Sequence, residues 1–150
     1  MSFTTTLAVL RDTTLDELGV TDPTPSTFDV VSSSRAEQLA GTQVGPHVLA
    51  VDPRLGELAV PAAARLGRQV HVVMLGGVSD TYVLQSHGPV ERLLVLQDGE
   101  VVEDRGERLP AEAVLDGQDD REDAFLALAV ALVDAPPEVL WEGAFVTLAG

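Results

Sequence analysis

Short apolar runs separated by turn residues dominate the chain, and the pattern is clearest between residues 69 and 103. Four of these runs are typical of β-strands: Gln69–Leu75, Thr81–Ser86, Arg92–Gln97 and Glu100–Glu103. The connections between them are too short for crossover helices. One connection is Asp98-Gly99, a pair that favours a two-residue hairpin turn. We therefore predict an antiparallel β meander over about residues 69–103.

A different pattern near the C-terminus predicts a helix over Asp119–Val133, because apolar residues cover almost its whole circumference. A helix that is apolar all round is buried, so we expect it to pack across the sheet. Asp116, Asp119 and Asp120 stand where carboxylates cap a helix and complement its dipole. The predicted fold class is α+β, with a single domain over residues 1–150 in which this helix (about residues 119–133) covers the meander.

The remaining segments are predicted from local signals. Strands are expected at Phe3–Leu10, Thr27–Val31, His47–Asp52 and Val139–Leu148. Helices are expected after the capping box Thr14-Leu15-Asp16-Glu17, at Ser34–Leu39 and at Leu58–Leu66. Residues 21–26 are predicted to form a loop, because Pro23 and Pro25 remove two backbone donors.

The distribution of charge adds information about possible partners to the predicted fold. The 150 residues include 24 acidic and 9 basic side chains, which give a formal net charge of -15. Residues 1–75 hold 8 acids and 5 arginines, whereas residues 76–150 hold 16 acids and 4 arginines. The segment from Asp98 to Asp123 alone contains 11 carboxylates and 3 arginines. A surface of this sign repels phosphate groups, so we expect neither nucleic acid nor an anionic membrane as a partner.

Cys, Lys, Asn and Ile are missing from the chain. Without cysteine, disulfides, iron–sulfur clusters and thiolate zinc sites are excluded. The other three residues have AT-rich codons, so their absence indicates a GC-rich genome, such as that of an actinobacterium or one of its phages. Part of the acidity then reflects genome composition. The N-terminus lacks the features of a secretory leader, and the longest apolar run, Ala124–Val133, is too short to cross a bilayer. A cytoplasmic location is expected.

One segment carries a family resemblance. Residues 101–110 have the pattern Val-x-Glu-Asp-x-Gly-Glu-x-Leu-Pro, which follows the Asp-Gly hairpin and precedes the acidic helix start. This pattern resembles small acidic actinobacterial proteins of unknown function, and residues 77–82 and 2–7 are similar to members of the same group. The resemblance implies an actinobacterial lineage and a single domain, and it implies nothing about mechanism.

The concentration of carboxylates in the second half suggests binding of another protein with a basic surface, because opposite charge accelerates association. The residues expected to make this contact are Asp98, Glu100, Glu103, Asp104, Glu107, Asp119, Asp120 and Trp141. The predicted function is a non-enzymatic protein-binding module, for example an immunity or antitoxin-like protein or an accessory protein of an actinobacterium or its phage. In the alternative interpretation the acids are a solvated surface that serves solubility, and Trp141 belongs to the core.

Two further functions stay open at this level. A small metal-dependent hydrolase could use His71, His87, Asp80 and Asp52, if the fold brings them together. A phage capsid or tail component would also fit the composition. The acids of residues 116–123 do not match the spacing of an EF-hand calcium loop, so helix capping explains them better. No cofactor and no metal are expected, and the oligomeric state is left open.

Overall fold

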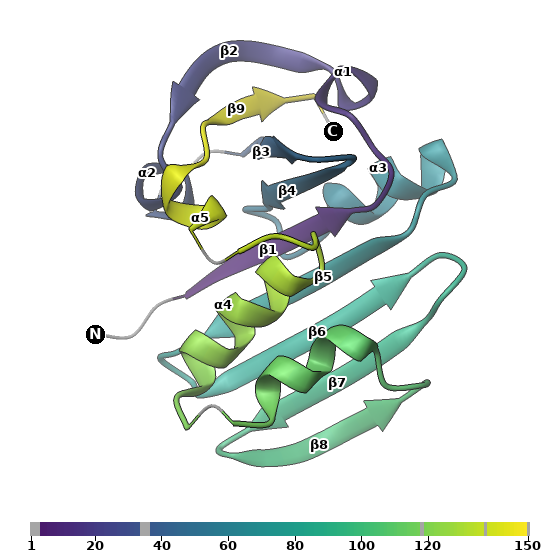
Figure 1. Ribbon diagram of the computed structural model, residues 1–150, viewed down its shortest axis with the longest axis vertical. Coiled ribbons are helices and arrows are strands. Elements are labelled where there is room, and N and C mark those ends of the chain that lie inside the picture. The colour runs from purple at the N-terminus through teal and green to yellow at the C-terminus, as the bar shows by residue number, and fades with distance from the viewer. Residues whose placement is uncertain (1–3, 34–36, 118, 137, 150) are drawn as a thin grey trace.

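The computed structural model describes residues 4–33, 37–117, 119–136 and 138–149, and within them a single antiparallel sheet runs through the whole molecule (Figure 1). Its nine strands lie in the order β2-β9-β3-β4-β1-β5-β6-β7-β8. Their bounds are β1 Thr4–Leu10, β2 Val20–Ser26, β3 Leu39–Val44, β4 His47–Val51, β5 Val70–Gly76, β6 Thr81–His87, β7 Arg92–Gln97, β8 Glu100–Arg105 and β9 Phe145–Leu148.

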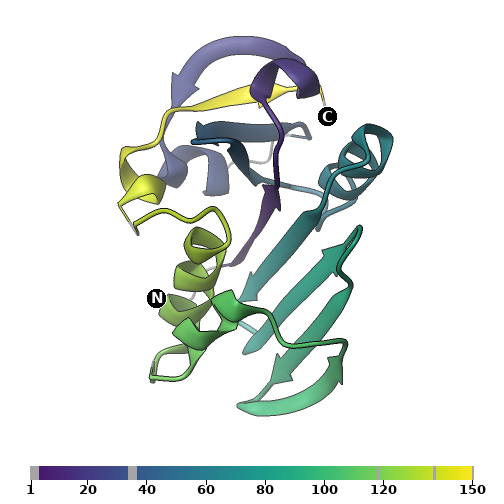
Figure 2. The ribbon, with the colours of Figure 1, turned by 45° about the vertical axis from the view of Figure 1, so that its right-hand side comes forward.

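Helices lie on both faces of this sheet (Figure 2). Their bounds are α1 Leu15–Leu18, α2 Phe28–Ser33, α3 Ala59–Leu66, the 3-10 helix η1 Pro110–Leu115, α4 Arg121–Ala131 and α5 Val139–Glu142. One hydrophobic cluster joins the sheet to residues of α2, α4 and α5, and a second cluster joins the opposite face to α1 and α3. We call these two sides of the sheet the α4 face and the α3 face.

β1 lies in the middle of the sheet and is buried on both faces. Leu7 and Val9 belong to the cluster on the α4 face, whereas Ala8 and Leu10 belong to the cluster on the α3 face. In β6 and β7 only alternate residues are buried, and these point toward α4. The α3 face of the β6–β8 end therefore stays partly open to solvent.

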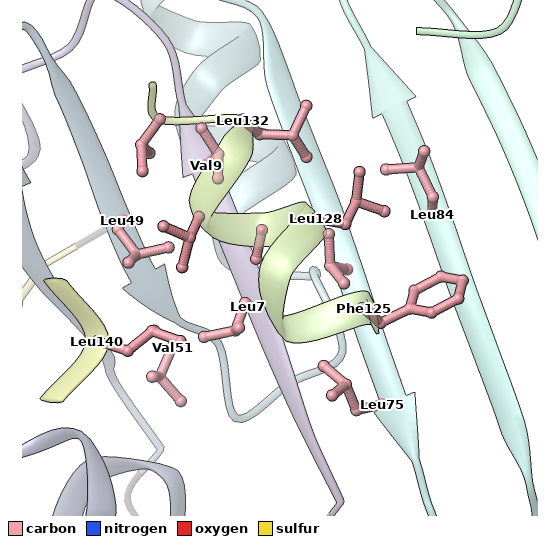
Figure 3. Close-up of a cluster of buried hydrophobic side chains, with 14 of the residues drawn as sticks. Leu7, Val9, Leu49, Val51, Leu75, Leu84, Phe125, Leu128, Leu132 and Leu140 are labelled. Atoms are coloured by element: carbon pink, nitrogen blue, oxygen red, sulfur yellow. The ribbon is translucent and has the colours of Figure 1, made fainter. Parts of the chain in front are cut away.

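The predicted buried helix is confirmed as α4. Phe125, Leu128 and Leu132 enter the core between the side chains of β1, β5 and β6 (Figure 3). The ring of Phe125 lies against that of Tyr82, with centroids 5.3 Å apart. The Asp120 side chain accepts a hydrogen bond from the Asp123 amide, so Asp120 is the N-cap that the acidic helix start predicted.

Several local predictions are also confirmed. The meander consists of β5, β6, β7 and β8, paired in chain order. The strands at Phe3–Leu10 and His47–Asp52 correspond to β1 and β4, with Phe3 outside the described residues, and the helix at Leu58–Leu66 corresponds to α3. Thr14 and Glu17 form both bonds of the capping box at the start of α1.

The extent of the sheet was underestimated, because the meander is only four strands of the nine. Residues 21–26 are not a loop: they belong to β2, which tolerates Pro23 and Pro25 because it lies at an edge of the sheet. β3 was not predicted at all, and it includes Leu39, which was assigned to a helical turn. The first residues of that turn, 34–36, lie outside the described residues.

Two further predictions are wrong in element type. The segment Thr27–Val31 was expected to be a strand but leads into helix α2. The predicted last strand, Val139–Leu148, is split into α5 and β9, since only Phe145–Leu148 pairs with other strands. Short apolar runs fit either element, so tertiary packing decides between them. In the described part of the chain no helix is long and apolar enough to span a membrane.

Candidate functional site

Six of the seven acidic residues predicted to bind a partner fall into two groups near β8. The first surrounds the β7–β8 turn and consists of Asp98, Glu100, Asp119 and Asp120; together with Asp80, which was expected only in the hydrolase alternative, we call it the open acidic cluster. The Asp98 amide donates to the Asp80 carbonyl at 3.0 Å, which joins the two hairpin turns. The Arg121 guanidinium donates to the Gly99 carbonyl at 3.1 Å, which joins the start of α4 to the same turn.

Among the described residues, none of the five carboxylates of the open acidic cluster forms an ion pair. The Arg121 guanidinium lies at the same turn, but it donates to the Gly99 carbonyl and not to a carboxylate of the cluster. Four of the five are exposed, and Asp80 is half-buried. Burial, together with the negative charges of Glu122, Asp80 and Asp120, raises the pKa of the nearby Tyr82 phenol. This end of the molecule therefore has a concentrated negative potential.

The second group, Glu103 and Asp104, lies toward the end of β8; together with Asp116, which was predicted only as a helix cap, we call it the paired acidic cluster. Each of these carboxylates meets an arginine. Arg105 Nε lies 3.0 Å from Glu103, Arg108 Nη2 lies 2.7 Å from Asp116, and Arg92 pairs with Asp104. The charge of this group is thus largely compensated within the chain.

Arg92 fixes the paired acidic cluster to the sheet. Its guanidinium is almost fully buried and donates from Nε and Nη2 to the two carboxylate oxygens of Glu112, at 2.9 and 2.7 Å. Glu112 lies in η1 and also accepts from the Leu109 amide at 2.6 Å. The remaining Nη1 donates to Asp104 and to the Arg105 carbonyl. The bonds to Glu112 and Asp104 raise the pKa of Arg92 and join η1 and the end of β8 to β7.

The buried pair of Arg92 and Glu112 was not among the predicted site residues. One signal for Glu112 was present, since Pro110 and Glu112 occupy the first and third positions of η1, as at a typical helix start. Nothing in the sequence shows that Arg92, the first residue of an apolar strand, points inward toward this carboxylate.

The other predicted contact residues lie apart from the open acidic cluster. Glu107 is exposed in the loop that follows β8 and forms no ion pair with a described residue. Trp141 lies on α5, far from β8 (Figure 1). It is 55% exposed, and its ring meets the ring of Phe28 edge-on at 5.4 Å. Trp141 is therefore not a core residue, and the structure does not bring it to the acidic residues.

The residues of the hydrolase alternative do not converge. His71 is buried on the α4 face, where its Nδ1 lies 2.7 Å from the Ser86 hydroxyl. Burial, helped by the charge of Arg11, lowers the pKa of His71 to about 4, so this imidazole is neutral near pH 7. His87 is exposed and pairs with Val70, whose side chain points to the α3 face. The two histidines thus lie on opposite faces of the sheet.

The two carboxylates of that alternative are also elsewhere. Asp80 lies in the β5–β6 turn, at the far end of a seven-residue strand from His87 and so about 20 Å away. Asp52 accepts hydrogen bonds from the amides of Arg54, Leu58 and Ala59, which organises the start of α3. In the part of the chain that the structure describes, no group of three or more His, Asp or Glu side chains is placed to hold a metal ion.

A hollow of about 670 Å³ opens near the ends of β1, β5 and β6. Its lining includes Thr4, Thr6 and Asp52, and Arg54 and Glu37, which lie 3.8 Å apart as an ion pair, also line it. Ser79 and Thr81 line it as well, although Asp80 between them does not, so the hollow adjoins the open acidic cluster without including its carboxylates. No protein-family model, curated protein or solved structure matches the chain.

Proposed function

We propose that the protein acts by binding another protein with a basic surface, and that the open acidic cluster makes the contact. The observation that carries this proposal is the contrast between the two groups of acids. Arginines of the chain compensate Glu103, Asp104 and Asp116, whereas the open acidic cluster has no such partner among the described residues. Uncompensated charge concentrated at one end accelerates association with a partner of opposite sign.

The proposal covers the immunity-like or accessory role expected from composition. In the immunity-like version, the basic partner is a toxin, and the open acidic cluster covers its positively charged groove. Solubility alone does not require that the unpaired acids lie together around one turn, so their placement supports binding over the solubility interpretation.

The experiment is capture of partners from the native host with two versions of the protein as bait. The first is the wild type, and the second carries four amide substitutions that remove charge and keep size: Asp98→Asn, Glu100→Gln, Asp119→Asn and Asp120→Asn. Asparagine also caps helices, so α4 keeps its N-cap. We expect a basic protein that is retained by the wild type, is lost by the variant, and is released between about 50 mM and about 300 mM salt.

A matched control removes the same number of charges elsewhere. Four exposed carboxylates without an ion pair in the described chain serve this purpose: Asp16, Glu57, Glu138 and Glu142. With these changed to amides, the net charge equals that of the first variant, and the partner should still bind. If both variants lose it equally, total charge and not the open acidic cluster determines binding, and the proposal is wrong.

A further inference from the structure

The outer edge of β8 offers backbone groups to another chain. In the described part of the protein, β8 is hydrogen-bonded along its length to β7 alone. It contains no proline, so each of its six residues has both an N–H and a C=O group. Val101 and Val102 are 58% and 51% exposed. An unpaired, exposed edge of this kind is a template for a further extended segment.

The edge is held in place before any partner arrives. Arg92, buried beneath the end of β8, bonds to Asp104 and to the carbonyls of Arg105 and Gly106. At the other end, Arg121 bonds to the Gly99 carbonyl in the turn that leads into β8. A strand that is already ordered loses less conformational entropy when another segment binds to it.

A β-bulge sets which side chains an added segment would meet. Val95 pairs with Glu103 and Leu96 pairs with Val101, so Val102 is the extra residue of β8. Glu103 and Glu100, which pairs with Gln97, therefore lie on the same face, although they are three residues apart. This is the α3 face, which stays partly open at the β6–β8 end. Val101 points to the α4 face, as its partner Leu96 does.

Charge decides which segment fits this edge. If a second copy of the chain added its own β8, two strands that each carry three carboxylates and one arginine would lie side by side, and the net repulsion between them would destabilise the pair. A segment with basic residues places one cation opposite Glu100, which has no ion pair among the described residues, and another opposite Glu103, where it shares the carboxylate with the exposed Arg105. An uncharged apolar segment would gain no such pairing.

We propose that the partner adds an extended segment to the outer edge of β8, with arginine or lysine facing Glu100 and Glu103 and an apolar residue beside Val101. This inference rests on the proposed function and specifies how the basic partner binds. The segment alternates basic and apolar residues, because successive side chains of a strand point to opposite faces. The main-chain bonds supply affinity, and the two glutamates select the sequence.

The test uses a short peptide of alternating arginine and valine, blocked at both ends, titrated into the whole protein with fluorescence anisotropy as readout. A second peptide has the same sequence with every backbone nitrogen methylated, which keeps all charges and removes all donors. We expect the methylated peptide to bind about a hundredfold more weakly. We expect the protein variant Glu100→Gln/Glu103→Gln to bind the first peptide about tenfold more weakly, and the control Asp16→Asn/Glu57→Gln to bind it normally.

Each outcome separates the inference from the proposed function. If both peptides bind the wild type equally well, charge alone holds the partner, so strand addition is wrong while the proposed function survives. If the first peptide binds the glutamate variant and the wild type equally, Glu100 and Glu103 do not select the segment and the inference fails. If the wild type associates with itself through β8, amide exchange in β8 will be slowed even without peptide. That result would show that a second copy of the chain occupies the edge, and it would overturn the inference.

Discussion

β2 and β8 border the same sheet, and in the described chain each leaves one backbone edge without a neighbouring strand. β2 contains Pro23 and Pro25, which have no N–H. The Thr24 amide between them donates to the Asp22 carboxylate at 3.0 Å, a bond that lowers the pKa of Asp22. Three consecutive residues of β2 therefore have no donor for an added strand, whatever the sequence of that strand.

β8 avoids self-pairing by a different device. It contains no proline and carries Glu100, Glu103 and Asp104 against the single Arg105, so its net negative charge repels acidic strands and attracts basic ones. Proline prevents strand addition by any partner because it has no N–H, whereas charge prevents it only for strands of like charge. An edge protected by charge alone is open to one class of protein, and this is the basis of the proposals above.

The largest expected effect concerns the anchor of β8. Arg92→Leu leaves the Glu112 carboxylate buried without its guanidinium, and removal of one partner of a buried pair costs about 3–5 kcal/mol. We expect the free energy of unfolding, measured with urea, to fall by that amount. The matched change Arg105→Leu removes an exposed pair with Glu103 and should cost less than about 1 kcal/mol. If Arg92→Leu and Arg105→Leu lower the free energy of unfolding equally, Arg92 does not anchor this side of the sheet.

Acid provides a second test, which concerns the packing of His71 on the β8 side of β1. Its pKa in the folded state is about 4, below the value of about 6.5 expected in the unfolded chain. The unfolded state therefore binds the extra proton first, and stability is lost as the pH falls from about 6.5 to about 4. The loss attributable to this histidine is about 3 kcal/mol at most.

The measurement is urea unfolding at pH 7 and pH 5 for the wild type and two variants. In His71→Gln the amide can still bond to Ser86, and the difference between the two pH values should become smaller. The rest of the difference includes His47, whose pKa is also lowered by burial and by Arg11. In His87→Gln, which changes an exposed histidine, the difference should persist. The same pH dependence in both variants would mean that His71 is not held neutral by burial.

The smallest effect on stability is expected for substitutions in β2. These substitutions nevertheless test the comparison of the two sheet edges most directly. Pro23→Thr/Pro25→Val restores two donors at an edge where Asp22 is the only charged residue, so we expect new concentration-dependent self-association in sedimentation experiments. The free energy of unfolding should fall by about 0.5–1 kcal/mol, because the unfolded chain gains freedom. The control Pro89→Ala changes an exposed loop and should not associate. A double variant that associates no more than the control would show that the prolines do not close this edge.

Elements whose partners are close in the chain could be predicted from the sequence. The meander β5–β8 follows from its short turns, and α4 follows from its apolar circumference and its aspartate cap. The other half of the sheet depends on distant pairing, since β9 lies between β2 and β3 although more than a hundred residues separate them in the chain. No local signal specifies such neighbours, and prolines in β2 favoured a loop.

The candidate site shows the same limit. Charge density indicated the acidic residues around β8, but it could not distinguish Asp104, which pairs with the distant Arg92, from Asp98, which has no cation among the described residues. Nor could the sequence show that an extra residue at Val102 places Glu100 and Glu103 on one face. Both distinctions depend on strand pairing and side-chain placement.

The central claim is that the edge of β8 accepts a basic strand and the edge of β2 does not. Amide hydrogen exchange of the wild type, with and without the arginine–valine peptide, tests it most directly, because added backbone bonds slow exchange where they form. We predict that exchange slows about tenfold or more in residues 100–105 and is unchanged in residues 20–26. Slowed exchange in β2, or peptide binding that leaves β8 unprotected, would contradict the account.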